Sequence, residues 1–413
     1  MSELEGGKLN PFQLYNTDLN YPTVFAAQHY IKNKKDNIDI NQKLSKVFLD
    51  IEVVADGGGT FDFDQIDQGK HSISCITIYS NMEKTFRVFA LVNRKNIDSW
   101  SSRTDHVDYF KSQIVEMDYL TEGEFDVIVK TYTSDLPLIK ECWNEIHRID
   151  PIVITGFNSD RFDLPYIYYR LKKLYNGDLA SVSKIMSKFS NVGISNFGGG
   201  RGQVNLVEYT CMDIAYLFRP RADAGLNLGF TLASYSLDFV SDAILKKKKL
   251  DYKSNGMSLD QFYDSDPIHY VLYNIVDVVL CVLLDKKLGM IEQYNTYRRL
   301  MKCSLGESLR GSTALFDSLV FHNLSEKNEA VRYGISDETI ITISKEEIDN
   351  IPKPLSKKTI KWDVTSIDQR SYLKITRKFE GAYVKNSPNR VYDQEDGLII
   401  DLDATSLYPS VLI

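Results

Sequence analysis

The alternation of strand-like and helix-like segments between residues 46 and 295 constrains the fold of this chain more than any other feature. Three β-rich runs come first: KVFLDIEVV, SISCITIYS and KTFRVFALV. Further strand-like runs then alternate with segments whose apolar residues recur at helical spacing. Because this order is typical of an α/β domain, we predict a mixed sheet with flanking helices.

The remaining residues divide around that domain. With 413 residues, the chain is too long for one ordinary core. We expect an N-terminal arm at residues 1–45 and the α/β domain at residues 46–295. Residues 296–413 are expected to form linker helices followed by a separate β-rich piece.

Composition argues against several classes of protein. The five cysteines are scattered without the spacing of a metal site or a redox motif, which favours a reducing compartment. The apolar run from Ile275 to Leu284 contains Asp277 and is too short to cross a bilayer, so we expect a cytoplasmic protein with no membrane partner. The net charge of −7 argues against extensive coating by nucleic acid, but it suits a site in which carboxylates hold cations.

Two acids stand in the first predicted strand, FLDIEVV. Asp50 and Glu52 are two residues apart, so their side chains point to one face of the strand, while Leu49 and Ile51 point to the other. Neighbouring carboxylates in a buried strand repel each other, and each needs a cation or a raised pKa. The alternative is an edge strand on which both acids face water.

Two further segments contribute acids. In GFNSDRFDLPYI a strand ends at Gly156, and Asp163 stands where a helix begins, as an N-cap or as a site residue. Asp160 is the competing candidate in that turn. In YNIVDVVL, Tyr273 and Asp277 are four residues apart and share one face of an apolar helix. An acid inside such a helix is either paired with a lysine or bound to a metal.

Together these acids form an all-oxygen set, with no histidine close to them in sequence. The predicted metal ligands are Asp50, Glu52, Asp163 and Asp277. Hard oxygen ligands select Mg²⁺ or Mn²⁺ rather than zinc, and two such ions can catalyse phosphodiester hydrolysis. Tyr273 could orient the attacking water. We interpret the lysine run KKKK at residues 246–249 as a solvated helix end that could contact a DNA backbone.

These segments stand in the order and approximate spacing of the three exonuclease motifs of family B DNA polymerases. The whole stretch most resembles the replicative polymerases of tailed bacteriophages, and SYSLDFV at residues 234–240 is a further local match. A tyrosine four residues before the last aspartate is typical of DEDD exonucleases with the ribonuclease H-like fold. The resemblance implies a 3′→5′ proofreading exonuclease at residues 46–295, with two Mg²⁺ or Mn²⁺ ions that share Asp50 as a ligand.

The final stretch, DLDATSLYPS, is similar to the first catalytic motif of the palm in the same polymerases. Residues 296–413 would then be linker helices and an incomplete palm, with Asp403 as a metal ligand and Asp401 as second choice. The implied nucleotide-binding residues are Asp403, Ser406, Leu407 and Tyr408. The implied DNA-binding residues are Asn158, Phe162, Arg201, Gly381 and Tyr383. Of these, Arg201 stands at the tip of a predicted β-hairpin around GGGRGQ.

In the related polymerases, the rest of the palm and the fingers follow this motif. We therefore expect DNA synthesis only with a C-terminal polymerase chain as partner, through which a sliding clamp could be bound. The expected substrates are single-stranded 3′ ends and primer–template DNA, in the cytoplasm of an infected host cell if a phage encodes the protein. Two alternatives stay open: a stand-alone DEDD exonuclease that acts on RNA or DNA, and a non-catalytic assembly subunit whose acids are structural.

Overall fold

The chain folds into two compact units. The computed structural model describes residues 29, 43–55, 63–196, 202–218, 232–251, 256–327, 338–343, 360–367 and 370–377. The larger unit comprises Asp18–Val331, and the smaller unit combines Met1–Thr17 with Arg332–Ile413. All four predicted exonuclease acids belong to the larger unit.

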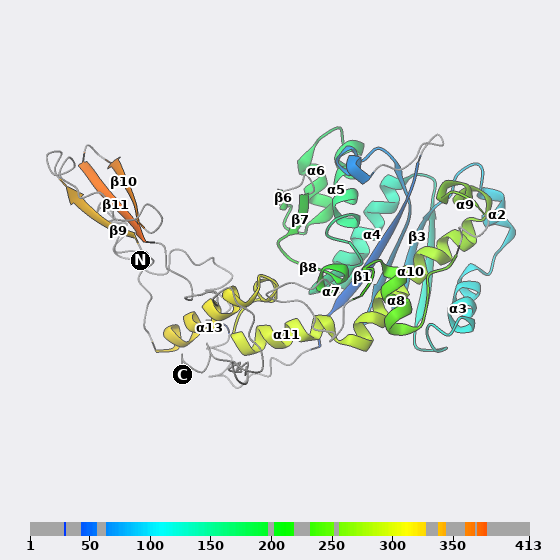
Figure 1. Cartoon of the computed structure of the whole chain (residues 1–413). Coiled ribbons are helices and arrows are strands. Elements are labelled where there is room, and N and C mark those ends of the chain that lie inside the picture. Colours follow the sequence, from blue (N-terminus) through cyan, green and yellow to red (C-terminus); the bar gives the residue numbers. More distant parts are fainter. Residues whose placement is uncertain are drawn as a thin grey trace, which may run out of the picture. The chain divides into compact units, whose positions relative to one another are not determined.

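A six-stranded sheet forms the centre of the larger unit, with the strand order β4-β3-β2-β1-β5-β8 (Figure 1). β1 pairs antiparallel with β2 and parallel with β5, and β5 pairs parallel with β8. The predicted mixed sheet is therefore confirmed. The strands are β1 (Lys46–Val54), β2 (Ser72–Ser80), β3 (Thr85–Leu91), β4 (Asp126–Tyr132), β5 (Val153–Gly156) and β8 (Thr210–Asp213).

Helices flank this sheet, as predicted, with α4 and α5 on one face and α10 on the other (Figure 1). The helices of the larger unit include the short 3₁₀ helix η2 (Phe63–Gln68), α2 (Ile97–Ser102), α3 (His106–Glu116), α4 (Asp135–Ile149), α5 (Asp163–Leu174), α6 (Leu179–Met186), α7 (Ile214–Phe218), α8 (Leu237–Leu245), α9 (Leu259–Ser265), α10 (Pro267–Leu288), α11 (Met290–Met301), α12 (Leu305–Ser308) and α13 (Ser312–Glu326).

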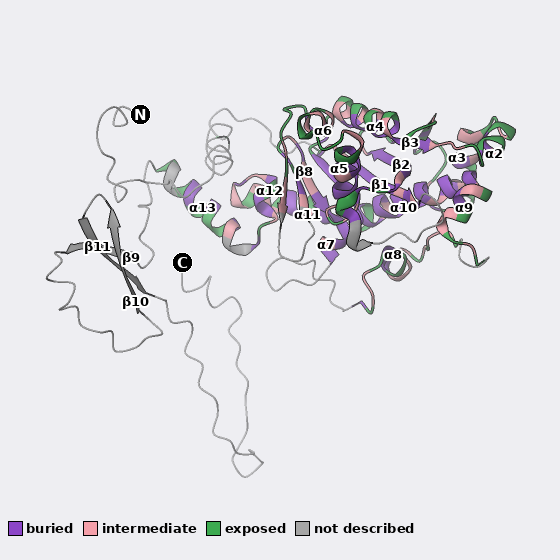
Figure 2. Cartoon of the chain, turned by 90° about the horizontal axis from the view of Figure 1, so that it is seen from above, coloured by how far each residue is buried: buried purple, intermediate pink, exposed green. Residues whose placement is uncertain are grey.

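β1 separates two hydrophobic clusters in the core. Leu49 and Ile51 belong to the cluster that includes residues of α4 and α5. Phe48 belongs to the cluster built around α10, and Asp50 and Glu52 share its face of the strand because strand side chains alternate. Figure 2 shows this concentration of buried positions on the sheet and on α10. Since β1 lies between β2 and β5, the edge-strand alternative is wrong.

α10 is a buried helix with well-defined ends. Pro267 occupies its first turn, and the Asp266 carboxylate accepts a hydrogen bond from the His269 N–H. Gly289 ends the helix with a φ of 62°, a conformation that glycine adopts without strain. The helix is long and apolar enough to cross a membrane, but 78% of its most apolar window is buried inside the structure, as in a core helix.

Two smaller sheets complete the described structure. The predicted hairpin is present: β6 (Val192–Asn196) pairs antiparallel with β7 (Gly202–Leu206), while its tip at residues 197–201 lies outside the described residues. The smaller unit contains an antiparallel sheet with the order β10-β11-β9. Its strands are β9 (Glu338–Ile343), β10 (Ile360–Ile367) and β11 (Arg370–Arg377).

Candidate active site in the exonuclease unit

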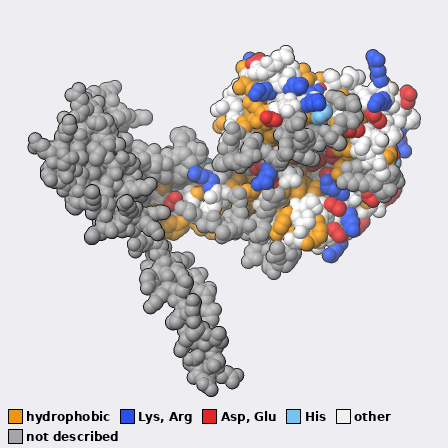
Figure 3. Space-filling view, turned by 45° about the horizontal axis from the view of Figure 1, so that its top comes forward, with side chains coloured by type: hydrophobic (Ala, Val, Ile, Leu, Met, Phe, Trp, Pro, Cys, Tyr) orange, Lys and Arg blue, Asp and Glu red, His pale blue; other side chains and the backbone are white. Residues whose placement is uncertain are grey.

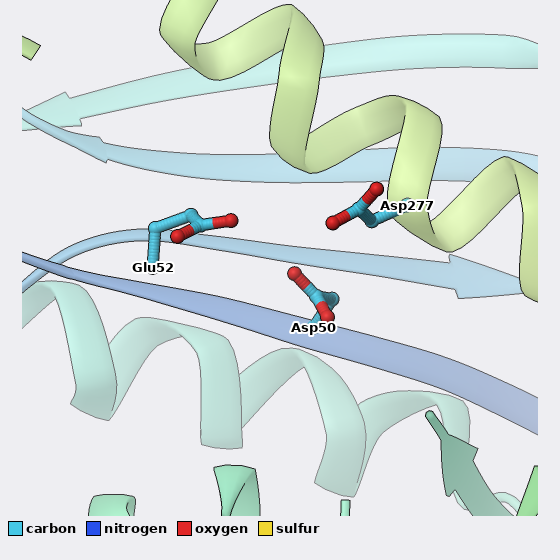
Figure 4. Close-up of side chains that lie close together, drawn as sticks. All are labelled: Asp50, Glu52 and Asp277. Carbon is cyan, nitrogen blue, oxygen red and sulfur yellow. The ribbon is translucent and has the colours of Figure 1, made fainter. Parts of the chain in front are cut away.

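Three carboxylates from two elements meet between β1 and α10. One oxygen each of Asp50, Glu52 and Asp277 lies within 4.8 Å of the others. Figure 4 shows the two strand acids and the helix acid directed toward one another. We call these three residues the acidic centre. It joins segments more than 200 residues apart in sequence, as the motif analysis predicted.

An irregularity in the sheet lies directly beside the acidic centre. The register between β1 and β2 shifts after Glu52, which pairs with Cys75, while Val53 pairs with Ile73. The extra residue, Ser74, donates a hydrogen bond from its hydroxyl to the Glu52 carbonyl at 3.0 Å. β-Bulges of this kind re-aim neighbouring side chains and are frequent next to active sites.

Two polar side chains contact the acidic centre that the sequence analysis did not assign to it. The Lys249 Nζ atom lies 2.5 Å from Asp277 Oδ2. The fully buried Asn274 donates a hydrogen bond from Nδ2 to Asp50 Oδ2 at 2.7 Å. Asn274 could have been found from its position one residue after Tyr273 on the apolar helix, but Lys249 arrives from a distant loop.

The solvated-helix-end interpretation of the lysine run is wrong for Lys249. Lys246 and Lys248 are exposed, but the Lys249 side chain is only 25% exposed and forms the ion pair with Asp277. The lysine-paired alternative for Asp277 is thus realised. It does not replace the clustering of acids, because Asp277 meets the lysine and two carboxylates at once.

Burial and mutual repulsion make the acidic centre a strong proton acceptor. Burial, followed by the charge of Asp163, holds the pKa of Asp50 well above its ordinary value. Burial and the nearby Asp277 raise the pKa of Glu52 to about 8, against the opposing charge of Lys249. Burial also raises the pKa of Asp277. One ammonium group therefore offsets only part of the negative charge that the centre carries when ionised.

The donor set suits a divalent cation. Asp277 Oδ1 is buried and has no hydrogen-bond partner among the residues that the structure describes. A buried acceptor without a donor costs free energy unless a cation or a proton satisfies it. Carboxylate oxygens from three side chains are the ligands that Mg²⁺ and Mn²⁺ prefer, so the residues fit the predicted metals.

Tyr273 lies on the same side of α10 as Asp277, as predicted. Its hydroxyl is 3.3 Å from Lys249 Nζ, which also lies 5.2 Å from the centre of its ring. Burial and the charge of Asp277 raise the pKa of the Tyr273 phenol. The phenol is therefore neutral at physiological pH and can donate a hydrogen bond.

Asp163 is the first residue of α5, at the side of the acidic centre. Its Oδ1 atom accepts a hydrogen bond from the Ile51 N–H at 3.1 Å, and Ile51 stands between the two strand acids. It is not among the three carboxylates that approach within 4.8 Å. Burial raises the pKa of Asp163 to about 8, although the Ile51 hydrogen bond opposes the shift.

Residues 157–162, which we call the anchored turn, connect β5 to α5. Asn158 has a left-handed φ of 67°, which asparagine tolerates better than most residues, and its N–H donates to Asp213 Oδ1 at 2.9 Å. Asp213 Oδ2 accepts from the Asp160 N–H at 3.3 Å. Asp213 belongs to none of the predicted motifs, and its position at the end of a β-prone run is the signal that the sequence offers.

The remaining predicted site residues are distributed as follows. Phe162 immediately precedes α5 and stacks on Tyr166 with 5.7 Å between ring centroids. Asp160, the competing candidate, is not one of the three clustered carboxylates and accepts a hydrogen bond from Gln203 of β7. The predicted residues that lie outside the described residues are Arg201, Gly381, Tyr383, Asp401, Asp403, Ser406, Leu407 and Tyr408.

The sequence matches known polymerases. The family "DNA polymerase family B, exonuclease domain" matches residues 11–240, more than half of the chain. The chain is 25% identical over 380 residues to the "DNA-directed DNA polymerase" of Escherichia phage RB69, covering 90% of this chain and 35% of the relative. It is 24% identical over 292 residues to the "DNA-directed DNA polymerase" of Enterobacteria phage T4, covering 68% and 30%.

A eukaryotic polymerase is also similar to most of this chain over a small part of its own length. The chain is 27% identical over 280 residues to the "DNA polymerase delta catalytic subunit" of Dictyostelium discoideum, covering 67% of this chain and 22% of the relative. It therefore spans between about a fifth and a third of the length of these curated relatives.

The structure adds residues of α10, which lie beyond the stretch that matches the family. Tyr273 and Asp277 lie beyond the matched residues 11–240, yet α10 brings Asp277 against Asp50 and Glu52 inside the match. Fold, acidic centre and sequence similarity thus agree. The chain belongs to the family B DNA polymerases and carries their exonuclease domain.

Proposed function

We propose that this chain is a 3′→5′ exonuclease that removes nucleotides from single-stranded 3′ ends of DNA. Its two Mg²⁺ or Mn²⁺ ions would be held by Asp50, Glu52, Asp163 and Asp277. The observation that carries the proposal is the acidic centre: three clustered carboxylates, one lysine and an Asp277 oxygen without a hydrogen-bond donor among the described residues. A divalent cation offsets the cost of such a cluster better than a single ammonium group does.

The side chains around the acidic centre would have different roles in the reaction. When bound, the ions would activate water and stabilise the leaving 3′-oxygen. Asn274 fixes the orientation of the Asp50 carboxylate through its 2.7 Å hydrogen bond. The neutral Tyr273 hydroxyl orients the attacking water, and Lys249 keeps that hydroxyl and Asp277 in place.

DNA contacts would come from a few local groups rather than from a broad basic surface. On the face seen in Figure 3, the Lys and Arg side chains of the described residues lie at several separate places, with Asp and Glu side chains between some of them. Asn158 and Phe162 in the anchored turn lie beside Asp163, and the Phe162 ring can stack on a base. Arg201, Gly381 and Tyr383 stay predictions.

DNA synthesis is a separate proposal. Asp403 as metal ligand, and Ser406, Leu407 and Tyr408 as nucleotide contacts, rest on the resemblance of DLDATSLYPS to the palm motif. A C-terminal polymerase chain would supply the remaining palm, fingers and thumb, and a sliding clamp would act through it. An intracellular site of action accords with relatives from phages and with a eukaryotic polymerase.

The proposed nuclease activity can be tested with the chain alone. A 5′-labelled single-stranded DNA oligonucleotide should shorten stepwise from its 3′ end with Mg²⁺ and stay intact with a chelator. An RNA oligonucleotide of the same sequence is the matched substrate: equal digestion of both would favour the stand-alone nuclease. Absence of both digestion and Mn²⁺ binding would overturn the proposal and favour the assembly subunit.

The proposed polymerase role needs a separate test. Adding a chain that carries a palm, fingers and thumb should permit templated extension of a primer, and extension should require Asp403. No extension with the added chain would leave the exonuclease as the function of this protein.

A further inference from the structure

The anchored turn is held by the central sheet at its two ends. Asp213 of β8 binds the backbone N–H groups of Asn158 and Asp160, so its carboxylate fixes the beginning and the middle of the turn. At the other end, Asp163 accepts a hydrogen bond from the Ile51 N–H of β1. These contacts connect the turn and Asp163 to β8 and β1 of the six-stranded sheet.

A third contact connects the turn to a different element. The Gln203 Nε2 atom of β7 donates a hydrogen bond to Asp160 Oδ2 at 2.8 Å. Gln203 pairs with Ser195 of β6, one pair before Asn196 and Gly202, which border the tip, and therefore lies near the tip of the two-stranded hairpin. The next residue, Val204, is 2% exposed and packs in the same hydrophobic cluster as Leu164 of α5. The part of β7 near the hairpin tip is thus fixed to the turn and helix that present Asp163.

We propose that Asp160 and Gln203 are positioning residues: their hydrogen bond couples the β6–β7 hairpin to the anchored turn, so that the position of the hairpin sets the placement of the Asp163 carboxylate. This inference rests on the proposed function only in treating Asp163 as a metal ligand. The coupling itself is a property of the fold, and it gives the hairpin a mechanical connection to the acidic centre.

The chemistry of Asp160 suits a coupling role rather than a metal ligand. Its Oδ2 atom is occupied by Gln203, and its Oδ1 atom has no hydrogen-bond partner within the described residues. Burial and the charge of Asp213 raise the pKa of Asp160 to about 7. A carboxyl oxygen accepts the Gln203 hydrogen bond in either protonation state, so asparagine should replace Asp160 without loss of the coupling.

Four variants isolate the hydrogen bond. Gln203→Ala removes the donor and Asp160→Leu removes the acceptor, whereas Asp160→Asn keeps an acceptor. The matched control is Asn205→Ala, because Asn205 lies on the same side of β7 and its Nδ2 binds only Ser195 within the hairpin, at 3.1 Å, among the described contacts.

Hydrogen–deuterium exchange measures the coupling without requiring activity. We expect exchange in the peptide that covers residues 157–163 to be about fivefold faster in Gln203→Ala and in Asp160→Leu, as for the loss of one hydrogen bond. Asp160→Asn and Asn205→Ala should exchange like the original chain. Equal exchange in Gln203→Ala and Asn205→Ala would overturn the coupling.

Mn²⁺ titration followed by electron paramagnetic resonance then connects the turn to the metal site. Affinity should fall about tenfold in Gln203→Ala and recover in Asp160→Asn, since groups that orient ligands have effects of this size. Faster exchange with unchanged Mn²⁺ affinity would overturn the placement of Asp163 by the hairpin. If the original chain binds no Mn²⁺, the proposed function fails, while the exchange data still decide whether the coupling exists.

Discussion

Asp277 of the acidic centre and Asp213, which binds the anchored turn, are both buried, but their charges are satisfied in different ways. Asp213, which holds the turn, receives backbone N–H donors from Asn158, Asp160 and Ala215. Asp50 receives one amide hydrogen bond, and Asp277 has one ammonium partner and an oxygen without a donor among the described residues. The carboxylate of Asp213 is thus saturated by the fold, whereas the carboxylate of Asp277 keeps acceptor capacity for a cation.

The strongest test of this distinction removes the strand acids. Asp50→Ala combined with Glu52→Ala should lower the rate of single-stranded DNA digestion by roughly 10³-fold or more, because two of the four proposed metal ligands are lost. The melting temperature should be unchanged or higher, since removal of like charges relieves repulsion. Digestion rates and thermal unfolding of the same preparation measure both effects.

A buried acid elsewhere on α10 provides the control. Asp285 accepts a hydrogen bond from the Ile291 N–H and forms an ion pair with Lys46. Asp285→Asn should lower the free energy of unfolding by roughly 3 kcal/mol and leave digestion at permissive temperature nearly unchanged. The distinction between ligand and structural acids breaks down if both variants lose stability and activity together.

Lys249 tests whether the acidic centre depends on the ammonium group that pairs with Asp277. Lys249→Met should reduce digestion roughly ten- to hundredfold, because Asp277 and Tyr273 lose the group that orients them. Lys248→Met is the neighbouring control: the Lys248 side chain is 68% exposed and lies 3.6 Å from Asp242. Similar rates for the two variants would contradict a role for Lys249 in the centre.

The tyrosine hydroxyl should have a smaller effect. Tyr273→Phe should slow digestion by up to roughly tenfold through kcat, while KM and Mn²⁺ affinity change little, since the hydroxyl is assigned to water rather than to the ions. Steady-state kinetics over a range of DNA concentrations separate the two parameters. A large rise in KM with unchanged kcat would place Tyr273 in DNA binding instead.

The pH dependence of stability should show the smallest effect. Glu52 and Asp163 have pKa values of about 8 when folded, compared with ordinary values of 4.5 and 3.8. The folded chain therefore binds more protons than the unfolded chain between these limits, and the stabilisation is present below about pH 4 and lost as pH rises through about 8. Without metal, melting temperature should fall from about pH 6 to about pH 8.

Mg²⁺ provides the check on that pH effect. Because the ion replaces protons at the carboxylates, it should raise the melting temperature more at about pH 8 than at about pH 6. Glu52→Gln should reduce the pH slope. A melting temperature that is independent of pH in the metal-free chain would contradict the raised pKa values of the acidic centre.

Sequence patterns predicted those strands and helices whose apolar and polar residues alternate with a clear period. Alternation in FLDIEVV placed Asp50 and Glu52 on one face, and helical spacing placed Tyr273 beside Asp277. Lys249 could not be predicted, because nothing in KKKK distinguishes the lysine that reaches α10 from its exposed neighbours. The register shift at Ser74 and the Gln203–Asp160 contact also depend on how distant segments pair, which a single sequence does not record.

The two-sided burial of β1 has a consequence for how the chain reaches its native alignment. A slip of one residue would turn Asp50 and Glu52 into the apolar layer under α4 and α5, and would send Leu49 and Ile51 toward Lys249. Placing two ionised groups in that layer would cost several kcal/mol. Asp50 and Glu52, which are assigned to hydrolysis, thus also disfavour a shifted register of β1. Their replacement by apolar side chains should make errors in strand alignment more frequent during folding.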